Sequence, residues 1–292
     1  MKRLLTFLVI LALIAGCYTP REKSYNIQCA VSVLPLADIV KQVGGDLVEV
    51  EVLVGPGQSP ATYSPSPQQL ASLRSAQVLF RIGVPYEEHL IPRLKELYPK
   101  IQIVDLSEGI ELLESVEHGH HGDPGHICGE LDPHIWMDPI LVQKMAMTIA
   151  THLKRIMPDK VGKIESNRRM FDSELARVDL LIEEELRGLK SRRFYVFHPA
   201  FGYFAQRYNL EQIPIESEGK EPSARQLAQL VEQARADSVR VVFVQPQFSD
   251  KSARAIADAI GGTVASIDPL APDYFEMLTK ISTALSEGMH QR

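Results

Sequence analysis

Strand-like and helix-like segments alternate twice along this chain, and this alternation restricts its fold more than any other feature of the sequence. The predicted strands are residues 26–34, 48–54, 77–82, 102–106, 194–198, 212–215, 239–244 and 263–267. Helical patterns lie between most of these strands, and the order strand–helix–strand favours parallel sheets with helices packed on their faces. The expected fold class is therefore α/β, with a mostly parallel four-stranded sheet in each half of the chain.

One long amphipathic segment separates the two halves. Its apolar residues recur at steps of three, four or seven and form a single stripe at positions 161, 164, 171, 175, 178, 182, 186 and 189. A continuous helix over 159–189 would be about 46 Å long. We therefore predict two lobes, 25–157 and 191–292, bridged by one long rigid helix within 158–190.

The composition of the 292 residues is that of a globular protein, with 45% hydrophobic and 23% charged residues. The formal net charge is −6, and no basic face of the kind that binds nucleic acids is evident. Three cysteines are too few for a fold built on disulfides.

The first residues have the pattern of a secretory signal. Lys2 and Arg3 precede an apolar run that ends in Gly16 and Cys17. The run is shorter than the roughly 20 residues of a membrane-spanning helix. The end of this run resembles a bacterial lipobox, so we expect residues 1–17 to be a signal with lipobox, Cys17 to be lipidated, and residues 18–24 to be a tether. The mature protein is then expected outside the cytoplasmic membrane, in the periplasm or on the outer face of the cell membrane, with a net charge of −8 after Lys2 and Arg3 are lost.

Three residues are candidate ligands because of where they lie. His134 is flanked by prolines that stiffen its backbone, while His198 and Asp268 each end a predicted strand. Ligands in parallel α/β sheets bind beyond the carboxyl ends of the strands. Each residue also has an ordinary structural interpretation: a buried hydrogen-bonded imidazole for either histidine, and a turn before proline for Asp268.

A histidine-rich loop interrupts the alternation between the first lobe's sheet and His134. It contains His118, His120, His121 and His126, beside acidic residues. Short histidine-rich tracts are typical of metal binding, although a merely soluble linker is the alternative.

Four segments together resemble the substrate-binding lipoproteins of zinc and manganese ABC transporters, the ZnuA/TroA-like family. They are SPATYSPSPQQL (59–70), LDPHIWMDP (131–139), FHPAFGYFAQRY (197–208) and IDPL (267–270). EGKEPSARQLAQL (218–230) and the histidine-rich loop resemble the zinc branch. The resemblance covers nearly the whole mature chain.

The resemblance implies a metal site in the cleft between two α/β lobes, with His134, His198 and Asp268 as ligands. Manganese members tend to have a carboxylate where His198 stands, so the implied metal is Zn²⁺, and Mn²⁺ or Fe²⁺ is the alternative. The implied function is high-affinity zinc capture outside the cytoplasm and delivery to the membrane permease of an ABC transporter. A monomer without enzymatic activity is expected, and cell adhesion stays open as a second role.

One position departs from the family pattern, because Ala61 stands where a histidine is usual. Zinc favours four ligands, so the fourth position is left open. Water would complete it, or one of the following residues: His89, His126, Cys128, Glu216 and Glu218.

Two further alternatives follow from the same residues. Three protein ligands and one open position are also typical of catalytic zinc, but no HExxH or other catalytic motif is present. Cys29 and Cys128 are available for a disulfide in an oxidising compartment, although Cys29 lies in a segment predicted to be a buried strand.

Overall fold

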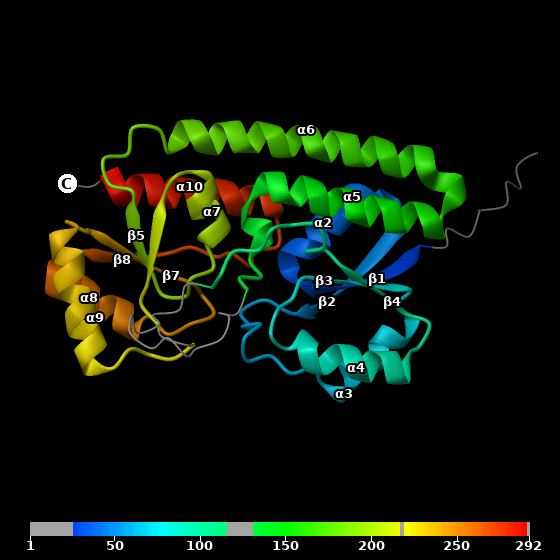
Figure 1. Ribbon diagram of the computed structural model, residues 1–292, viewed down its shortest axis with the longest axis horizontal. Coiled ribbons are helices and arrows are strands. Elements are labelled where there is room, and N and C mark those ends of the chain that lie inside the picture. Colours follow the sequence, from blue (N-terminus) through cyan, green and yellow to red (C-terminus); the bar gives the residue numbers. More distant parts are fainter. Residues whose placement is uncertain (1–25, 116–130, 217–218, 291–292) are drawn as a thin grey trace, which may run out of the picture.

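Two parallel four-stranded sheets form the two halves of the protein in a computed structural model (Figure 1), which describes residues 26–115, 131–216 and 219–290. The strand orders are β2-β1-β3-β4 and β6-β5-β7-β8, so the second sheet repeats the topology of the first. Every neighbouring pair of strands is parallel. The predicted α/β fold with two lobes is confirmed.

Short strands alternate with helices along the whole chain. The strands are β1 (Ile27–Val33), β2 (Val48–Val54), β3 (Val78–Arg81), β4 (Gln102–Asp105), β5 (Arg193–Val196), β6 (Glu211–Pro214), β7 (Val241–Val244) and β8 (Thr263–Ser266). The α-helices are α2 (Leu34–Gly44), α3 (Pro67–Ser72), α4 (Glu87–Leu97), α5 (Pro139–Ile156), α6 (Val161–Glu185), α7 (Gly202–Arg207), α8 (Ala224–Ala236), α9 (Lys251–Ile260) and α10 (Tyr274–His290).

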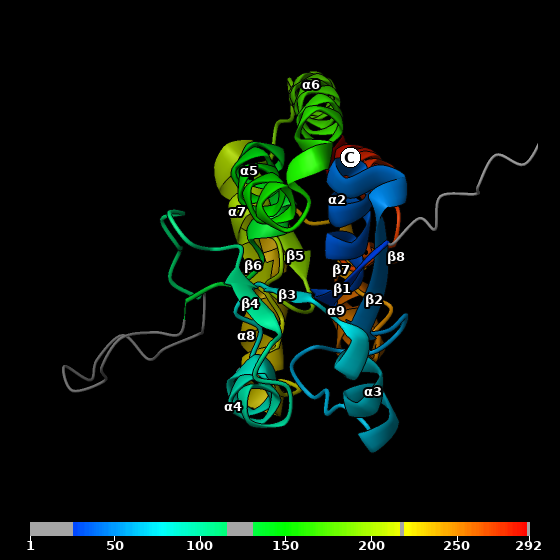
Figure 2. The same cartoon turned by 90° about the vertical axis from the view of Figure 1, so that its right-hand side faces the viewer.

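Helix α6 links the halves and runs along the length of the molecule (Figure 1). It packs on α5 and α2 of the first half and on α10 at the end of the chain, and Figure 2 shows it lying over these helices. The predicted apolar stripe is buried from Ile164 onward, but Val161 at its start is 42% exposed, and the helix is shorter than 159–189. With 25 residues it is about 37 Å long.

Helix α6 is shorter than predicted because the backbone leaves the α-helical conformation at each end of the segment. Residues Pro158–Lys160 form a separate 3-10 turn, and Lys160, with φ −108° and ψ 7°, lies outside the α-helix. At the other end, Gly188 has a positive φ of 82°, which a right-handed helix does not contain. Leu186 and Leu189 are still buried, so the stripe continues past the helix into the turn.

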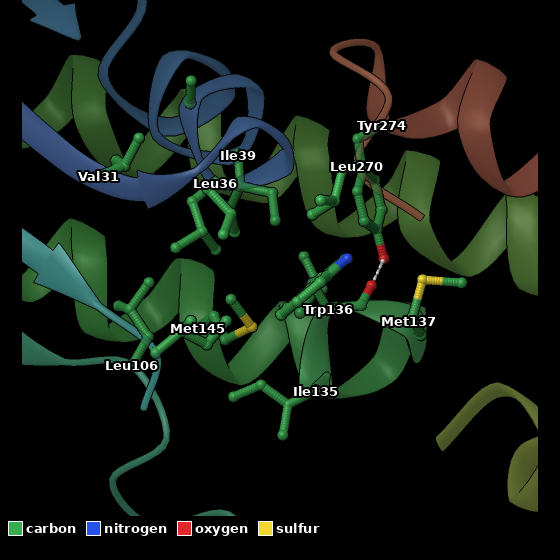
Figure 3. Close-up of a cluster of buried hydrophobic side chains, with 14 of the residues drawn as sticks. Val31, Leu36, Ile39, Leu106, Ile135, Trp136, Met137, Met145, Leu270 and Tyr274 are labelled. Atoms are coloured by element: carbon green, nitrogen blue, oxygen red, sulfur yellow. Dashed lines mark hydrogen bonds between the residues drawn. The ribbon is translucent and has the colours of Figure 1, made fainter. Parts of the chain in front are cut away.

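The larger of two hydrophobic clusters in the described residues extends across both halves. Figure 3 shows Trp136 and Tyr274 within it, where the Tyr274 hydroxyl donates a 2.8 Å hydrogen bond to the Trp136 carbonyl oxygen. The indole Nε1 of Trp136 in turn donates to the Pro269 carbonyl oxygen at 2.8 Å. The second half has an additional smaller cluster between its sheet and helices α8 and α9. The shared core therefore fixes the two halves relative to each other.

Two other observations concern the sequence-based predictions. Cys29 is a free, buried thiol in β1, and burial raises its pKa to about 12. Several residues named in the predictions lie outside the described residues: Cys17, Cys128, Glu218 and the loop histidines His118, His120, His121 and His126. No helix within the described ranges has the length and apolar character needed to cross a membrane.

Candidate metal centre

His134 lies between the Asp132-Pro133 pair and a 3-10 turn of residues Ile135–Met137. The carboxylate of Asp132 holds it in two ways. Asp132 Oδ1 accepts a hydrogen bond from the His134 backbone N–H at 2.9 Å and lies 2.7 Å from the ring Nδ1. Asp132 is buried, so this contact is shielded from water. The orientation of the imidazole is therefore set by its own loop.

His198 belongs to the second half and lies two residues beyond the end of β5. The side chain of Gln245 accepts from the His198 N–H at 3.1 Å and donates to its carbonyl oxygen at 2.6 Å. The ring of Phe248 stacks on the imidazole with a centroid distance of 5.1 Å. The buried carboxylate of Glu216 places Oε1 2.5 Å from the ring Nδ1.

The two imidazoles meet although they belong to different lobes. Their ring centroids are 5.2 Å apart, with the planes inclined at 71°. In each ring the Nδ1 atom faces a carboxylate, so a neutral imidazole carries its proton there and leaves the Nε2 lone pair available. Carboxylate–imidazole pairs of this kind are typical of metal-ligating histidines.

Asp268 follows β8 and is partly buried. Its Oδ1 accepts hydrogen bonds from Gln247 Nε2 at 2.8 Å and from the Leu270 N–H at 3.0 Å. The next residue, Pro269, is tied to Trp136, which lies two residues beyond His134. Within residues 26–115, 131–216 and 219–290, no three His, Cys, Asp or Glu side chains form a ready metal cluster. The structure thus brings His134 and His198 together, and the part of Asp268 stays a prediction.

The candidates for the fourth position differ in their placement. Ala61 lies in an exposed turn, where its backbone N–H contacts Ser59. His89 is exposed on α4. Glu216 adjoins His198, and its second oxygen, Oε2, is buried without a hydrogen-bond partner in the described part of the chain. Glu216 is therefore the one described candidate in contact with a predicted ligand.

Sequence reasoning missed the part played by Asp132. It lies two residues before His134 in the motif, and an Asp-Pro-His order was a usable signal, because an aspartate readily bonds the backbone two residues later. The pairing of Glu216 with His198 had no comparable signal, since the residues are 18 positions apart and follow different strands, β6 and β5.

The chain as a whole is similar to known zinc-uptake proteins. A family model described as the zinc-uptake complex component A, periplasmic (ZnuA), matches residues 30–288. The high-affinity zinc uptake system protein ZnuA of Bacillus subtilis is 29% identical over 256 residues, which covers 85% of this chain and 80% of the relative. The zinc-binding lipoprotein AdcA of Streptococcus pneumoniae is 29% identical over 98% of this chain, but the chain spans only 57% of AdcA.

Solved structures agree with the sequence comparison. A crystal structure of ZnuA has a TM-score of 0.85 and 39% identity, and covers 90% of this chain and 99% of its own. A zinc-bound ZnuA deletion mutant has a TM-score of 0.84 and 38% identity, and covers 91% and 99%. Because the family model spans most of the sequence, the chain belongs to the ZnuA family of periplasmic zinc-uptake complex components.

Proposed function

We propose that this protein captures zinc outside the cytoplasm and passes it to the membrane permease of an ABC transporter. One observation carries the proposal: the His134 and His198 rings, from opposite lobes, lie 5.2 Å apart, each with a carboxylate at Nδ1. This arrangement leaves two Nε2 atoms to share one ion. Membership of a zinc-uptake family and the zinc named for the relatives support the choice of cargo.

The proposed ligands are His134 Nε2, His198 Nε2 and the carboxylate of Asp268. Imidazole and carboxylate donors together suit zinc, which favours four-coordinate tetrahedral geometry. Asp268 Oδ1 is already engaged by Gln247 and Leu270, so Oδ2 is the oxygen available to the ion. Water or a loop histidine such as His126 completes the set, since Ala61 has no donor side chain. Mn²⁺ or Fe²⁺ is the alternative cargo.

The same geometry favours binding over catalysis. A catalytic zinc needs a general base near the bound water. The two carboxylates beside the imidazoles, Asp132 and Glu216, are buried and each holds a ring Nδ1. They orient ligands, and neither is exposed to a substrate. We therefore assign the protein a transport role and no enzymatic one. The proposed acting form is a monomer.

The location of the protein is part of the proposal. The signal-like segment 1–17 ends in Cys17, and the S. pneumoniae relative is named a lipoprotein. A protein lipidated at Cys17 stays outside the cytoplasmic membrane by its acyl chains, close to a permease. Growth of cells on limiting zinc with Cys17→Ala, compared with the unchanged protein, tests this part separately.

A competition titration with Zn²⁺ tests the capture function. It uses soluble protein beginning at Tyr18, the His198→Ala variant and a variant lacking residues 117–127. Tight one-to-one binding that is lost in His198→Ala supports the proposal, and loss on deleting the loop assigns the fourth ligand to the loop. Failure of every form to bind Zn²⁺ tightly contradicts it, and the same titration with Mn²⁺ and Fe²⁺ then identifies the cargo.

A further inference from the structure

A side chain of helix α7, in the second lobe, forms hydrogen bonds with the backbone of the first lobe close to His134. Its Tyr203 hydroxyl donates to the Asp132 carbonyl oxygen at 2.8 Å and accepts from the Leu113 N–H at 3.0 Å. Tyr203 is buried, and desolvation raises its pKa to about 12, so the hydroxyl keeps its proton at neutral pH. It therefore serves as both donor and acceptor to the first lobe.

These two hydrogen bonds complete a strand pair. In an antiparallel hydrogen-bonded pair, two opposite residues exchange both N–H···O bonds. Here the Asp132 N–H donates directly to the Leu113 carbonyl oxygen at 2.8 Å, next to an antiparallel bridge between Glu114 and Leu131. The return bond from Leu113 to Asp132 is not direct, because the Tyr203 hydroxyl is inserted into it. The Tyr203 side chain of the second lobe thus supplies the missing link between the Leu113 and Asp132 backbones of the first lobe.

The residue before Tyr203 has no space for a side chain. A Cβ on Gly202 would lie 2.7 Å from Asp132 Oδ2 and 3.2 Å from Gln212 Nε2. The first approach is shorter than real Cβ contacts, so any larger residue must displace the Asp132 carboxylate. The other oxygen of that carboxylate holds His134. Gly202 and Tyr203 together therefore confine both the backbone and the side chain of Asp132.

We propose that Tyr203 is a positioning residue for zinc binding: through Asp132 it sets the His134 imidazole at the distance from His198 that one ion requires. This inference rests on the proposed function. It adds a connection that runs from α7 to Tyr203, then to Asp132 and His134. Since α7 begins four residues after His198, one short segment places both imidazoles.

The expected effect follows from what Tyr203→Phe removes. The phenyl ring keeps the packing, but the Leu113 N–H and the Asp132 carbonyl oxygen both lose their bridge. The Asp132 loop then has more freedom, and the zinc dissociation constant is expected to rise about tenfold, the lower end of the range for residues that orient metal ligands. Gly202→Ala displaces the Asp132 side chain directly and is expected to raise it at least as much.

The experiment compares Zn²⁺ dissociation constants and Co²⁺ absorption spectra for the wild type, Tyr203→Phe, Gly202→Ala and Tyr208→Phe. Tyr208 is the matched control: its hydroxyl donates to Asp179 at 2.9 Å, it adjoins the same helix, and no contact joins it to Asp132. Co²⁺ reports ligand geometry, which a merely structural role would leave unchanged. Thermal unfolding of the metal-free proteins measures folding separately.

The outcomes separate the inference from the proposed function. Weakened zinc binding with an altered Co²⁺ spectrum in Tyr203→Phe, and neither change in Tyr208→Phe, supports the inference. Wild-type affinity and spectrum in Tyr203→Phe overturn it, provided that His198→Ala abolishes tight binding. Equal losses in Tyr203→Phe and Tyr208→Phe that follow their melting temperatures also overturn it. If His198→Ala binds zinc as the wild type does, the proposed function itself has failed.

Discussion

Oε1 of Glu216 lies 2.5 Å from Nδ1 of His198, and Asp132 Oδ1 makes the same kind of contact with His134 at 2.7 Å. The two lobes thus present similar carboxylate–imidazole pairs to each other. Such pairing fixes the tautomer and raises the basicity of the ring nitrogen that faces the metal. Zinc affinity should therefore depend on residues that never touch the ion.

Glu216→Ala tests this dependence. The substitution removes the acceptor at Nδ1 of His198, so the ring can rotate and its proton is free to occupy Nε2. We expect the zinc dissociation constant to rise about 10- to 100-fold, with a smaller rise for Glu216→Gln, which retains an acceptor. A competition titration measures both. Glu211→Ala is the control, because Glu211 lies exposed on β6, five residues before Glu216, and pairs with Arg193. Unchanged affinity in Glu216→Ala would show that the pair has no role in binding.

Trp136 provides an optical test of the site. It is the only tryptophan in the chain, and its ring centroid lies 5.1 Å from that of His134. A bound cation is a large local charge, so zinc at His134 should change the tryptophan emission with one-to-one stoichiometry. The change should vanish in His134→Ala and persist in His89→Ala, since His89 is exposed on α4. An emission change that survives in His134→Ala would place the ion elsewhere.

The hydrogen bonds of Trp136 should contribute measurably to stability. Tyr274→Phe leaves the Trp136 carbonyl oxygen without its donor, and we expect a loss of about 1 kcal/mol in the free energy of unfolding. Trp136→Phe keeps the backbone carbonyl that Tyr274 binds, but it removes the indole donor to Pro269 and opens a cavity in the shared core, so about 3 kcal/mol is expected. Urea unfolding of the metal-free protein measures both losses. Equal losses for the two variants would contradict this assignment.

The ion pairs of Glu165 should make the stability of the contact between α5 and α6 depend on pH. Hydrogen bonds from Arg168, at 2.7 Å, and from Lys154, at 3.1 Å, lower the pKa of the Glu165 carboxyl from 4.5 to about 2. The unfolded chain therefore binds more protons between these values, and the stabilisation is present above pH 4.5 and lost as the pH falls toward 2. Because the side chain is partly exposed, about 1 kcal/mol or less is expected.

The measurement compares Glu165→Gln with the unchanged protein. The difference in unfolding free energy should be largest near pH 7 and shrink toward zero at low pH. Glu184→Gln serves as the control, since Glu184 pairs with Arg187 on the exposed face of α6 and should change little at either pH. A Glu165→Gln difference that stays constant with pH would mean that the carboxylate charge does not stabilise the contact.

Most of the fold could be predicted because its elements are local patterns. The bounds of β2 match the predicted residues 48–54, since this strand is a regular apolar alternation between clear loop signals. The length of α6 could not be predicted, because apolar residues 186 and 189 continue the stripe although Gly188 has left the helix. Beyond residue 185 the apolar side chains are still buried, but the backbone is no longer helical. An apolar sequence pattern indicates which side chains are buried and does not show where the helix ends.

The candidate site was predictable only in part, for a related reason. His134 and His198 stand out through flanking prolines and strand ends, and their convergence follows from the fold. The contact of Tyr203 with Asp132 joins residues 71 positions apart. The Tyr203 hydroxyl also takes the place of a direct backbone hydrogen bond between Leu113 and Asp132, and no sequence pattern indicates that this bond is missing. The fourth ligand could not be predicted from the motif, because Ala61 has no donor side chain where the family pattern has a histidine.

The proposed zinc ion is shared by His134 and His198 across the two lobes. Anomalous diffraction at the zinc edge, from crystals of the protein loaded with one equivalent of Zn²⁺, locates the ion relative to both rings. We expect a single strong peak about 2.0–2.1 Å from Nε2 of both rings. A peak bound by only one of these histidines, or one at the loop alone, would contradict it.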